Sequence, residues 1–376
     1  MKIGIDARFF GSLGKGLGRY TQKLVENLEM IDHENDYFIF LRRENFDEYV
    51  PRNPKFKKVL ADYRWYTFSE QLAFPRLLGE YNLDLMHFPH FNVPLFYRRK
   101  FLVTVHDLIL IHFPTMRNTT LNPLFYWLKF LAYKIIIRSA LVRSESIITV
   151  SNFTKNDILK NYPAISEGKI SVTYEAAQNH HAAELENSAD VLKKYGIIEP
   201  YMMYVGNAYP HKNLERLIES FLLAKKKISY LKLVLVGKED YFYARLKRSI
   251  DRPTFSGIIF AGFVPDDELD ILFASAEAFV FPSLYEGFGL PPLEAMARGV
   301  PVISSDHPCM KEVLGESAHF FDGNDVNQMA EAIEKISTDK KLREDLIAKG
   351  FEQVKKYDWM KMAKETLEIY KCRKEK

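Results

Sequence analysis

Two glutamates, Glu286 and Glu294, stand eight residues apart in the segment Tyr285-Glu-Gly-Phe-Gly-Leu-Pro-Pro-Leu-Glu294. An apolar run before them predicts a buried strand, the Pro-Pro pair suits the first turn of a helix, and Gly299 ends that helix. Backbone amides and a positive helix terminus would then face a ligand over the strand end, which suits a phosphate. One carboxylate could bind sugar hydroxyls and the other a ribose diol. The alternative is a loop glutamate and a solvated helix glutamate.

Lys212 follows another predicted strand in a similar way. Tyr201–Val205 leads into Gly206-Asn-Ala-Tyr-Pro-His-Lys-Asn213, and an apolar stripe at helical spacing starts at Leu214. Lys212 would therefore stand at the mouth of a helix, with Asn213 as the N-cap. A cation there would help the helix terminus to hold a diphosphate, whereas a surface lysine beside a cap is the alternative.

His106 ends an apolar run, Phe101–Val105, and precedes Asp107. Open α/β sheets bind ligands beyond the carboxyl ends of their strands, so a histidine there is a candidate for catalysis. A capped structural histidine fits this pattern equally well.

Glycines 14, 16 and 18 follow the first predicted strand and precede a helix predicted over Tyr20–Leu28. Spaced glycines let backbone amides approach an anion closely. These glycines do not form the motif Gly-x-Gly-x-x-Gly, and they lie well past the strand end. Both points disfavour a nicotinamide cofactor. A plain flexible loop fits about as well as an anion-binding loop.

The length of 376 residues and the 47% hydrophobic content predict a globular protein of two domains. No run of eighteen apolar residues occurs, and the amino terminus reads as a strand, so we expect neither a membrane-spanning helix nor secretion. The two cysteines are far apart and form neither a metal-ligand pattern nor a disulfide framework. This usage fits a reducing cytoplasm.

Short apolar runs alternate with helical patterns, as in parallel sheets covered by helices. We predict a first doubly wound domain over 1–173, a linker over 174–199 and a second such domain over 200–355. A helical segment over 356–376 would follow and could cross back to the first domain. The predicted strands are Lys2–Asp6, Tyr37–Leu41, Asp84–Phe88, Leu102–His106, Ser146–Val150, Ile170–Thr173, Tyr201–Val205, Leu231–Val236, Ile258–Phe260, Ala278–Phe281, Val302–Ser304 and His319–Phe321.

Charge is uneven along the chain. Residues 1–172 carry 24 Lys+Arg and 17 Asp+Glu, a net +7, although the whole chain is only +3. A basic half suggests an anionic partner such as a membrane surface, a lipid-linked phosphate or a nucleic acid, with ordinary solvated charge as the alternative. Asn122–Arg143 reads as an amphipathic, aromatic and basic helix. We interpret it first as a helix that covers the sheet and second as one that lies on an anionic bilayer.

Together these motifs resemble glycosyltransferase family 4, whose members are retaining sugar transferases of the GT-B fold. The similarity spans nearly the whole chain and is densest in Val205–Glu215 and Phe260–Val302; the most specific part runs from Glu286 to Glu294. The resemblance implies an α/β protein of GT-B fold, with two Rossmann-like doubly wound domains facing a central cleft. It implies that the second domain holds most of the nucleotide sugar and the first domain the acceptor.

The resemblance also implies roles for individual residues. The catalytic residues would be His106, Glu286 and Lys212. The donor sugar would contact Glu286, Gly287, Phe288, Gly289 and Leu290, largely through backbone amides. The nucleotide would contact Gly16, Gly206, Asn207, Lys212, Gly262, Phe263, Val264 and Glu294, with Lys212 on the diphosphate and Glu294 on the ribose.

The chain departs from the family pattern at two places. Asn207 stands where the family often has an arginine, and Lys15-Gly16 replaces a pair of glycines. Lys15 or Arg19 could take over those diphosphate contacts. The sequence has no Asp-x-Asp motif, and the implied mechanism needs neither a metal ion nor a protein nucleophile, so we expect no metal site and no cofactor.

The segments Gly4-Ile-Asp-Ala-Arg8 and Pro210-His-Lys-Asn213 look like those of bacterial mannosyltransferases of polysaccharide assembly. This implies GDP-mannose as the donor substrate and a glycan or lipid-linked glycan as the acceptor. A UDP- or dTDP-sugar donor, a GT-B sugar-nucleotide epimerase and a non-catalytic nucleotide-sugar-binding protein stay open. Basic patches without a recognition motif give no case for nucleic acid. We expect a cytoplasmic enzyme with peripheral contact at the inner face of an anionic membrane.

Overall fold

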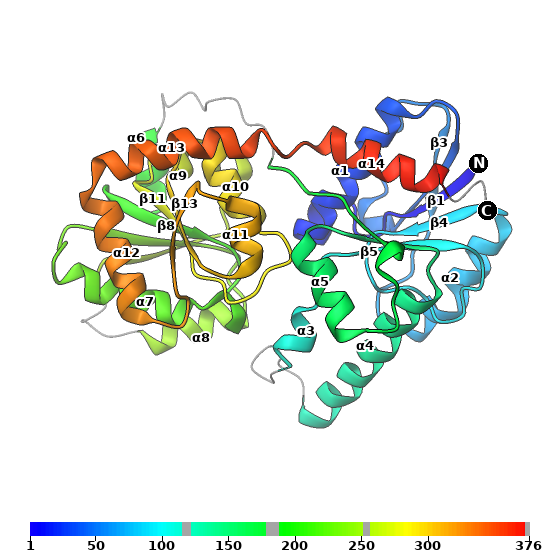
Figure 1. Ribbon diagram of the computed structural model, residues 1–376, viewed down its shortest axis with the longest axis horizontal. Helices are drawn as coiled ribbons and strands as arrows, with labels where there is room; N and C mark the ends of the chain where they lie inside the picture. Colours follow the sequence, from blue (N-terminus) through cyan, green and yellow to red (C-terminus); the bar gives the residue numbers. More distant parts are fainter. Residues whose placement is uncertain (115–121, 178–187, 251–255, 373–376) are drawn as a thin grey trace. The chain divides into compact units, whose positions relative to one another are not determined.

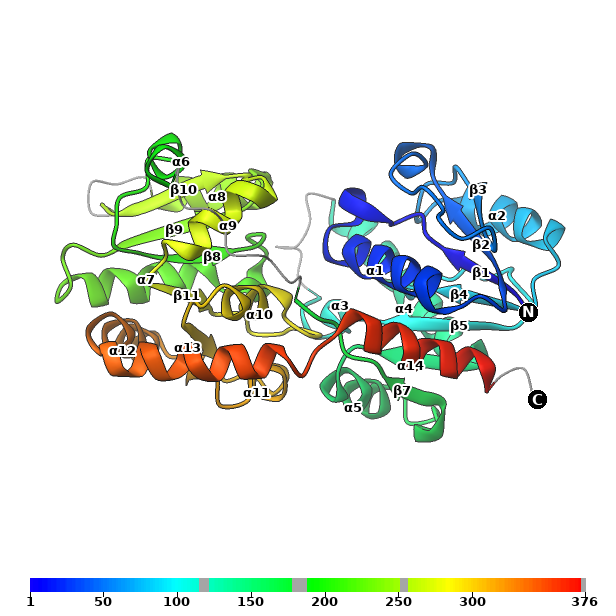
Figure 2. The same cartoon turned by 90° about the horizontal axis from the view of Figure 1, so that it is seen from above.

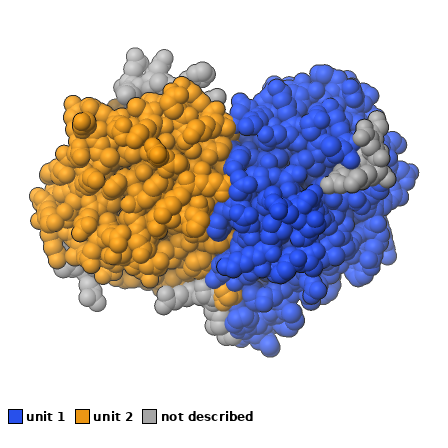
Figure 3. Space-filling model, viewed as in Figure 1, with its two compact units in different colours: residues 1–112, 122–175, 358–376 blue, residues 113–121, 176–357 orange. Residues whose placement is uncertain are grey.

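The computed structural model describes residues 1–114, 122–177, 188–250 and 256–372. It divides the chain into two units (Figure 3). Unit 1 comprises Met1–His112, Asn122–Glu175 and Asp358–Lys376, and unit 2 comprises Phe113–Leu121 and Ala176–Tyr357. Of the segment 174–199, residues 178–187 lie outside the described part of the chain.

Unit 1 contains a parallel sheet of seven strands in the order β3-β2-β1-β4-β5-β6-β7. The order reverses between β1 and β4, so the chain turns away in opposite directions at their carboxyl ends. In open α/β sheets ligands bind at such a switch point. The strands are β1 Lys2–Asp6, β2 Asp36–Leu41, β3 Phe56–Leu60, β4 Leu85–Phe88, β5 Phe101–Val105, β6 Ser146–Thr149 and β7 Ile170–Val172.

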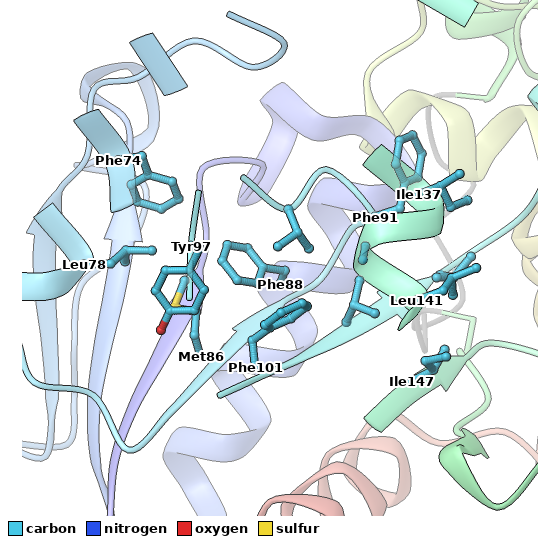
Figure 4. Packing of buried hydrophobic residues seen from close by; sticks show 14 of the residues in the cluster. Phe74, Leu78, Met86, Phe88, Phe91, Tyr97, Phe101, Ile137, Leu141 and Ile147 are labelled. Carbon is cyan, nitrogen blue, oxygen red and sulfur yellow. The ribbon is translucent and has the colours of Figure 1, made fainter. Parts of the chain in front are cut away.

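Helices cover both faces of this sheet (Figures 1 and 2). Side chains of α2 and α4 join the strands in one apolar cluster, part of which Figure 4 shows. α1 and α14 pack against each other on the opposite face of the sheet. There the hydroxyl oxygen of Tyr370 on α14 lies 2.6 Å from Nδ1 of the buried His87 on β4. The helices of unit 1 are α1 Lys15–Ile31, α2 Phe68–Glu80, α3 Ile109–His112, α4 Pro123–Arg143, α5 Asn152–Asn161 and α14 Trp359–Lys371, with short 3-10 turns η1 Gly11–Gly14, η2 Arg43–Asn45 and η4 Glu167–Lys169.

Unit 2 repeats the same plan with six parallel strands in the order β10-β9-β8-β11-β12-β13, so its switch point lies between β8 and β11. The strands are β8 Tyr201–Val205, β9 Lys232–Val236, β10 Ile258–Gly262, β11 Ala278–Phe281, β12 Val302–Ser305 and β13 Ala318–Phe321. Its helices are α6 Ser188–Lys194, α7 Leu214–Lys225, α8 Tyr241–Ser249, α9 Asp266–Ala274, α10 Leu290–Ala297, α11 Pro308–Leu314, α12 Val326–Thr338 and α13 Lys340–Val354, with the 3-10 turn η6 Pro210–Lys212.

All twelve predicted strands are present, with bounds shifted by at most two residues, but the prediction lacked β3. This strand lies at the edge of its sheet, and its sequence Phe-Lys-Lys-Val-Leu has exposed or half-exposed side chains at three of five positions. Lysines on an edge strand hinder pairing with other chains, and here they also hid the strand from a search for apolar runs.

The predicted start of the first helix, at Tyr20, is wrong. Helix α1 begins at Lys15, so Gly16 and Gly18 lie inside it rather than in a loop. Gly18 is needed for packing, because a Cβ there would stand 2.1 Å from the carbonyl oxygen of Gly11 and 2.5 Å from that of Phe9. Gly18 therefore reflects close contact between α1 and the preceding turn.

Within the described residues, no helix combines the length and the apolar character that a membrane span requires. Helix α4 begins at Pro123, directly after the predicted first residue Asn122. Asn122 is its N-cap, because the side chain of Asn122 accepts a hydrogen bond from the amide of Leu124. One of its faces packs on the sheet, as first interpreted, but the expected amphipathic pattern is wrong because the opposite face is also apolar.

Candidate active site

The switch point of unit 2 brings together Lys212 and Glu286, which the sequence separates by 74 residues. Lys212 ends η6, in the connection after β8, and Glu286 follows β11, the neighbouring strand. The Lys212 Nζ donates to Glu286 Oε1 at 2.5 Å, and the two side chains are 15% and 9% exposed. A cation and an anion are thus held at the sheet edge where an open sheet of this order binds ligands.

Three further hydrogen bonds fix the loops that carry this pair. The Asn213 side chain donates to the carbonyl oxygens of Pro282, at 3.1 Å, and Gly323, at 2.7 Å. The amide of Leu284 donates to the carbonyl of His211 at 2.7 Å. Asn213 occupies the predicted N-cap position of α7 but makes no side-chain cap; its left-handed backbone, with φ of 63°, turns its amide toward the loop after β11 instead.

Lys212 keeps Glu286 ionised in a buried place. Burial by itself would raise the pKa of this carboxyl, because the charged form loses hydration. The charge and the hydrogen bond of Lys212 outweigh that effect, and the pKa of Glu286 lies below its usual value. By contrast, burial and the same lysine lower the pKa of the neighbouring His211 to about 4, so that histidine is neutral at pH 7.

Gly287, Phe288 and Gly289 form a buried turn that leads from Glu286 into α10. Gly289 has φ of 91°, and a Cβ on it would stand 2.5 Å from the terminal methyl carbon of Met310. Only glycine fits both requirements. Phe288 is 3% exposed and its ring packs edge-on against Tyr357, so this residue can offer a ligand its backbone but not its side chain.

Glu294 lies at the fifth position of α10 and, like Glu286, is buried. The turn before α10 thus carries one predicted carboxylate and the first turns of the helix the other. Leu290, predicted to contact the donor sugar, is the first residue of α10.

Gly262 is the last residue of β10, and Phe263 and Val264 follow it at the carboxyl edge of the same sheet. Gly262 has φ of 73°, and no atom lies within 4 Å of a Cβ built on it. Val264 is buried, whereas the Phe263 ring is 71% exposed. An open, rigid aromatic face of this kind suits a planar base.

Gly206 and Asn207 begin the loop after β8. The carbonyl oxygen of Gly206 accepts a hydrogen bond from the Tyr243 hydroxyl at 2.9 Å, and that of Asn207 accepts one from Tyr204 at 2.8 Å. A Cβ on Gly206 would meet the Tyr204 hydroxyl at 2.5 Å. The loop therefore starts from a fixed position, and Lys212 is carried on a rigid element.

His106 belongs to unit 1, where it follows β5 and contacts two acceptors. Its Nδ1 lies 3.0 Å from Glu175 Oε1, and its Nε2 lies 2.9 Å from the carbonyl oxygen of Pro89. Neither partner has a proton to give, so the full pattern requires a proton on both nitrogens. Burial would lower the pKa of His106, but the hydrogen bond and charge of Glu175 outweigh it, and the pKa is raised. Contact with Glu175 thus favours the protonated form of His106.

Glu175 is the residue that the sequence analysis missed. It was placed in the predicted linker, yet it is 6% exposed and ends the second segment of unit 1. One feature of the sequence could have indicated Glu175: it lies three residues after β7. Because β5 and β7 are parallel strands of one sheet, Glu175 and His106 follow strands at the same edge of that sheet.

Gly16 is also in unit 1, in the first turn of α1, where it is exposed and has no atom within 4 Å of a Cβ built on it. Unit 1 therefore carries His106 and Gly16, and unit 2 carries all the other predicted site residues. Among the residues that the structure describes, no group of three or more His, Cys, Asp or Glu side chains could hold a metal ion.

Comparisons with known proteins agree with this architecture. Residues 14–176 match the family described as Glycosyltransferase Family 4, and residues 192–353 match Glycosyl transferases group 1. The O-antigen chain mannosyltransferase B of Escherichia coli is 29% identical, covering 95% of this chain and 96% of that protein. The O-antigen chain mannosyltransferase RfbU of Salmonella typhimurium is 32% identical, covering 79% of this chain and 76% of its own.

Solved structures share the fold at low identity. Sucrose-phosphate synthase from Thermosynechococcus elongatus matches with a TM-score of 0.76 at 19% identity, over 99% of this chain and 98% of its own. Anabaena HepE in complex with UDP-glucose matches with a TM-score of 0.74 at 13% identity, over 99% of both chains. The two family matches and the two parallel sheets of Rossmann order together define a glycosyltransferase of the GT-B fold. The chain belongs to glycosyltransferase family 4.

Proposed function

We propose that this protein transfers mannose from GDP-mannose, with retention of anomeric configuration, to a glycan or lipid-linked glycan during synthesis of a cell-surface polysaccharide. The observation that carries the proposal is the Lys212–Glu286 pair at the switch point of unit 2. The choice of mannose is supported by the two O-antigen mannosyltransferases that resemble the chain over most of its length.

In this proposal Lys212 acts on the leaving group. Breaking the bond between the sugar C1 and the β-phosphate oxygen leaves negative charge on the diphosphate. Lys212 would leave Glu286 for that charge, and the amino-terminal end of α10 with the turn Gly287–Gly289 would add oriented backbone dipoles. Preorganised groups of this kind stabilise a transition state more than they stabilise the bound substrate.

Glu286 would orient the hydroxyls of the donor sugar once Lys212 has turned to the phosphate. Its pKa is below the usual value, so it is a carboxylate at neutral pH and accepts hydrogen bonds. The acceptor hydroxyl attacks C1 on the same face of the sugar from which the diphosphate leaves. The proton of that hydroxyl passes to a β-phosphate oxygen. Glu286 forms no covalent bond in this scheme, and Lys212 with the backbone dipoles supplies the charge stabilisation without a metal ion.

The nucleotide would be held by unit 2, with Glu294 on the ribose hydroxyls and Phe263 against the base. The exposed ring of Phe263 and the buried carboxylate of Glu294 support these roles. Lys15 and Arg19 stay candidates for further diphosphate contacts. Unit 1 would bind the acceptor and supply His106, whose imidazolium adds positive charge near the reacting sugar. We place the reaction at the cytoplasmic face of a membrane, where a lipid-linked acceptor is found.

A thermal-shift panel with GDP, UDP, dTDP and ADP, and with their common sugar conjugates, tests the donor. A ligand that binds only the folded protein stabilises it by about 2.7 kcal/mol at a hundredfold excess over its dissociation constant. A selective shift with GDP and GDP-mannose is expected. A selective shift with UDP- or dTDP-sugars would replace the donor, and no shift with any of them would contradict the proposal.

Transfer to an acceptor separates the remaining alternatives. A sugar-nucleotide epimerase would convert the donor without any acceptor, and a binding protein would neither transfer nor hydrolyse it. We expect transfer that depends on acceptor, with an α-mannosyl product in the nuclear magnetic resonance spectrum. A β-linked product would contradict retention.

A further inference from the structure

Helix α4 has a stripe of large apolar side chains on the face that points away from unit 1. The stripe consists of Leu124, Leu128, Leu131, Ile135 and Val142, which are between 51% and 67% exposed. Their spacing of four, three, four and seven residues places them in one line along the helix. Monomeric proteins seldom expose a continuous apolar surface of this kind unless it binds something.

The helix does not need this stripe for folding. Its opposite face holds Tyr126, Tyr133, Ile137, Ala140 and Leu141, each at most 8% exposed, and four of these five belong to the apolar cluster of unit 1. Ile137 and Leu141 appear in that cluster in Figure 4. The outer stripe is therefore a second apolar face, and in Figure 1 the first turns of α4 project beyond the strands of unit 1.

Cations and aromatic rings flank the stripe. Lys129, Lys134 and Arg138 are exposed, Phe125 is 61% exposed and Trp127 is 50% exposed. The helix contains no acidic residue at all. Long basic side chains can lay their carbon stems on apolar surface and extend the charge to water or to a phosphate, and tryptophan prefers the boundary between hydrocarbon and water.

The basic character continues past the carboxyl end of α4. Arg143 donates to the carbonyl oxygen of Leu95 at 3.0 Å, which ties the helix end to the loop that carries the exposed Phe96 and Arg98. The pKa of Arg143 is lowered by burial and by the nearby charge of Arg98. Two arginine charges this close to each other favour an anionic partner.

We propose that the outer face of α4, from Leu124 to Val142, lies on the surface of an anionic bilayer. The stripe would enter the boundary between headgroups and acyl chains, and the three exposed cations would bind lipid phosphates, as interfacial helices do. A second copy of the chain is the less suitable occupant, because a symmetric contact through α4 would oppose cation to cation with no acid to neutralise them. The inference extends the proposed function to a lipid-linked acceptor, but its test needs neither donor nor acceptor.

Co-sedimentation with phosphatidylcholine vesicles, with and without phosphatidylglycerol, measures this binding. We expect the protein to pellet with the anionic vesicles and to be released as salt is added. Leu128→Ser/Ile135→Ser should weaken binding by roughly tenfold or more for each side chain, since each loses its apolar burial. Lys129→Gln/Lys134→Gln should weaken it by about fivefold per cation.

The matched control is Phe68→Ser/Leu72→Ser, which removes two side chains of α2 that are 90% and 51% exposed. This variant should bind anionic vesicles as the wild type does. Wild-type protein that stays in the supernatant at low salt would overturn the proposal. So would equal loss of binding in the α2 variant, or a dimer that the α4 variant dissociates. All variants should keep the GDP thermal shift of the wild type, so a missing shift counts against the donor assignment and not against the bilayer.

Discussion

Removing the lysine of the Lys212–Glu286 pair should destabilise unit 2 in a way that depends on pH. In Lys212→Ala the Glu286 carboxyl stays buried without its cation, a situation that costs about 3 kcal/mol in proteins. For a unit of this size that corresponds to a lower unfolding midpoint by roughly 6–12 °C. Differential scanning calorimetry at neutral pH measures the effect.

The pH dependence identifies the cause. In the wild type the pKa of Glu286 is lowered on folding, so its contribution is present above the unfolded pKa of about 4.3 and is lost as the pH falls through the folded value. In Lys212→Ala only His211 and Ser283 oppose the effect of burial on Glu286, so we expect its folded pKa to rise above the unfolded one. The penalty is then present at pH 7, declines as the pH falls below the raised folded pKa, and is gone below the unfolded pKa. The gap between the two proteins should therefore shrink toward about pH 4.

Two further variants complete this test. Lys212→Ala/Glu286→Gln removes both charges and should regain most of the lost stability while remaining inactive. Lys311→Ala breaks a pair with Asp306 whose side chains are about half exposed, and it should cost less than about 1 kcal/mol. A Lys212→Ala protein with the wild-type midpoint at every pH, or one with near-normal transfer, would refute the reasoning.

The unit 1 site and the glycines give further predictions. Glu175→Gln should lower turnover and move the basic limb of the pH–rate profile to lower pH, because the pKa of His106 loses the charge that raises it; an unchanged profile would show that the pair has no part in the reaction. His106→Ala should lower turnover strongly while the melting profile stays cooperative, and full activity would contradict its catalytic role. Gly289→Ala should destabilise the fold by about 1–3 kcal/mol in urea unfolding, since φ is positive and Met310 fills the space. Gly16→Ala, in an open helical position, should leave stability unchanged or slightly higher, so any loss of donor affinity there would measure the contact itself.

The sequence was enough to predict twelve of the thirteen strands of the described residues and to place Lys212, Glu286 and His106 beyond strand ends, because buried parallel strands are nearly continuous apolar runs. It could not give the pairing of Lys212 with Glu286. That pairing depends on β8 and β11 being neighbours, although β9 and β10 lie between them along the chain. Asn213 was correctly placed at the helix start, but its bonds to Pro282 and Gly323 are also products of the strand order.

Where the predictions were wrong or incomplete, the deciding contact was remote or the local pattern misled. Gly18 is required because carbonyl groups seven and nine residues earlier leave no room for a side chain. From the sequence alone, this glycine fitted a flexible loop about as well as an anion-binding one. Glu175 lies 69 residues from His106 and followed a short last strand, where the composition indicated a linker. Helix α4 was predicted to be amphipathic, with one apolar face. It has apolar residues on two opposite faces, one buried and one exposed.

The central claim is that the switch point of unit 2 is the donor site and that Lys212 is its diphosphate ligand. Isothermal titration of GDP-mannose into the wild type and into Lys212→Ala/Glu286→Gln tests it most directly, since that variant should remain folded. The account predicts saturable one-to-one binding to the wild type and a loss of at least about tenfold in affinity, or 1.4 kcal/mol, in the variant. Binding that is equally tight in both proteins, or absent from both, would contradict it.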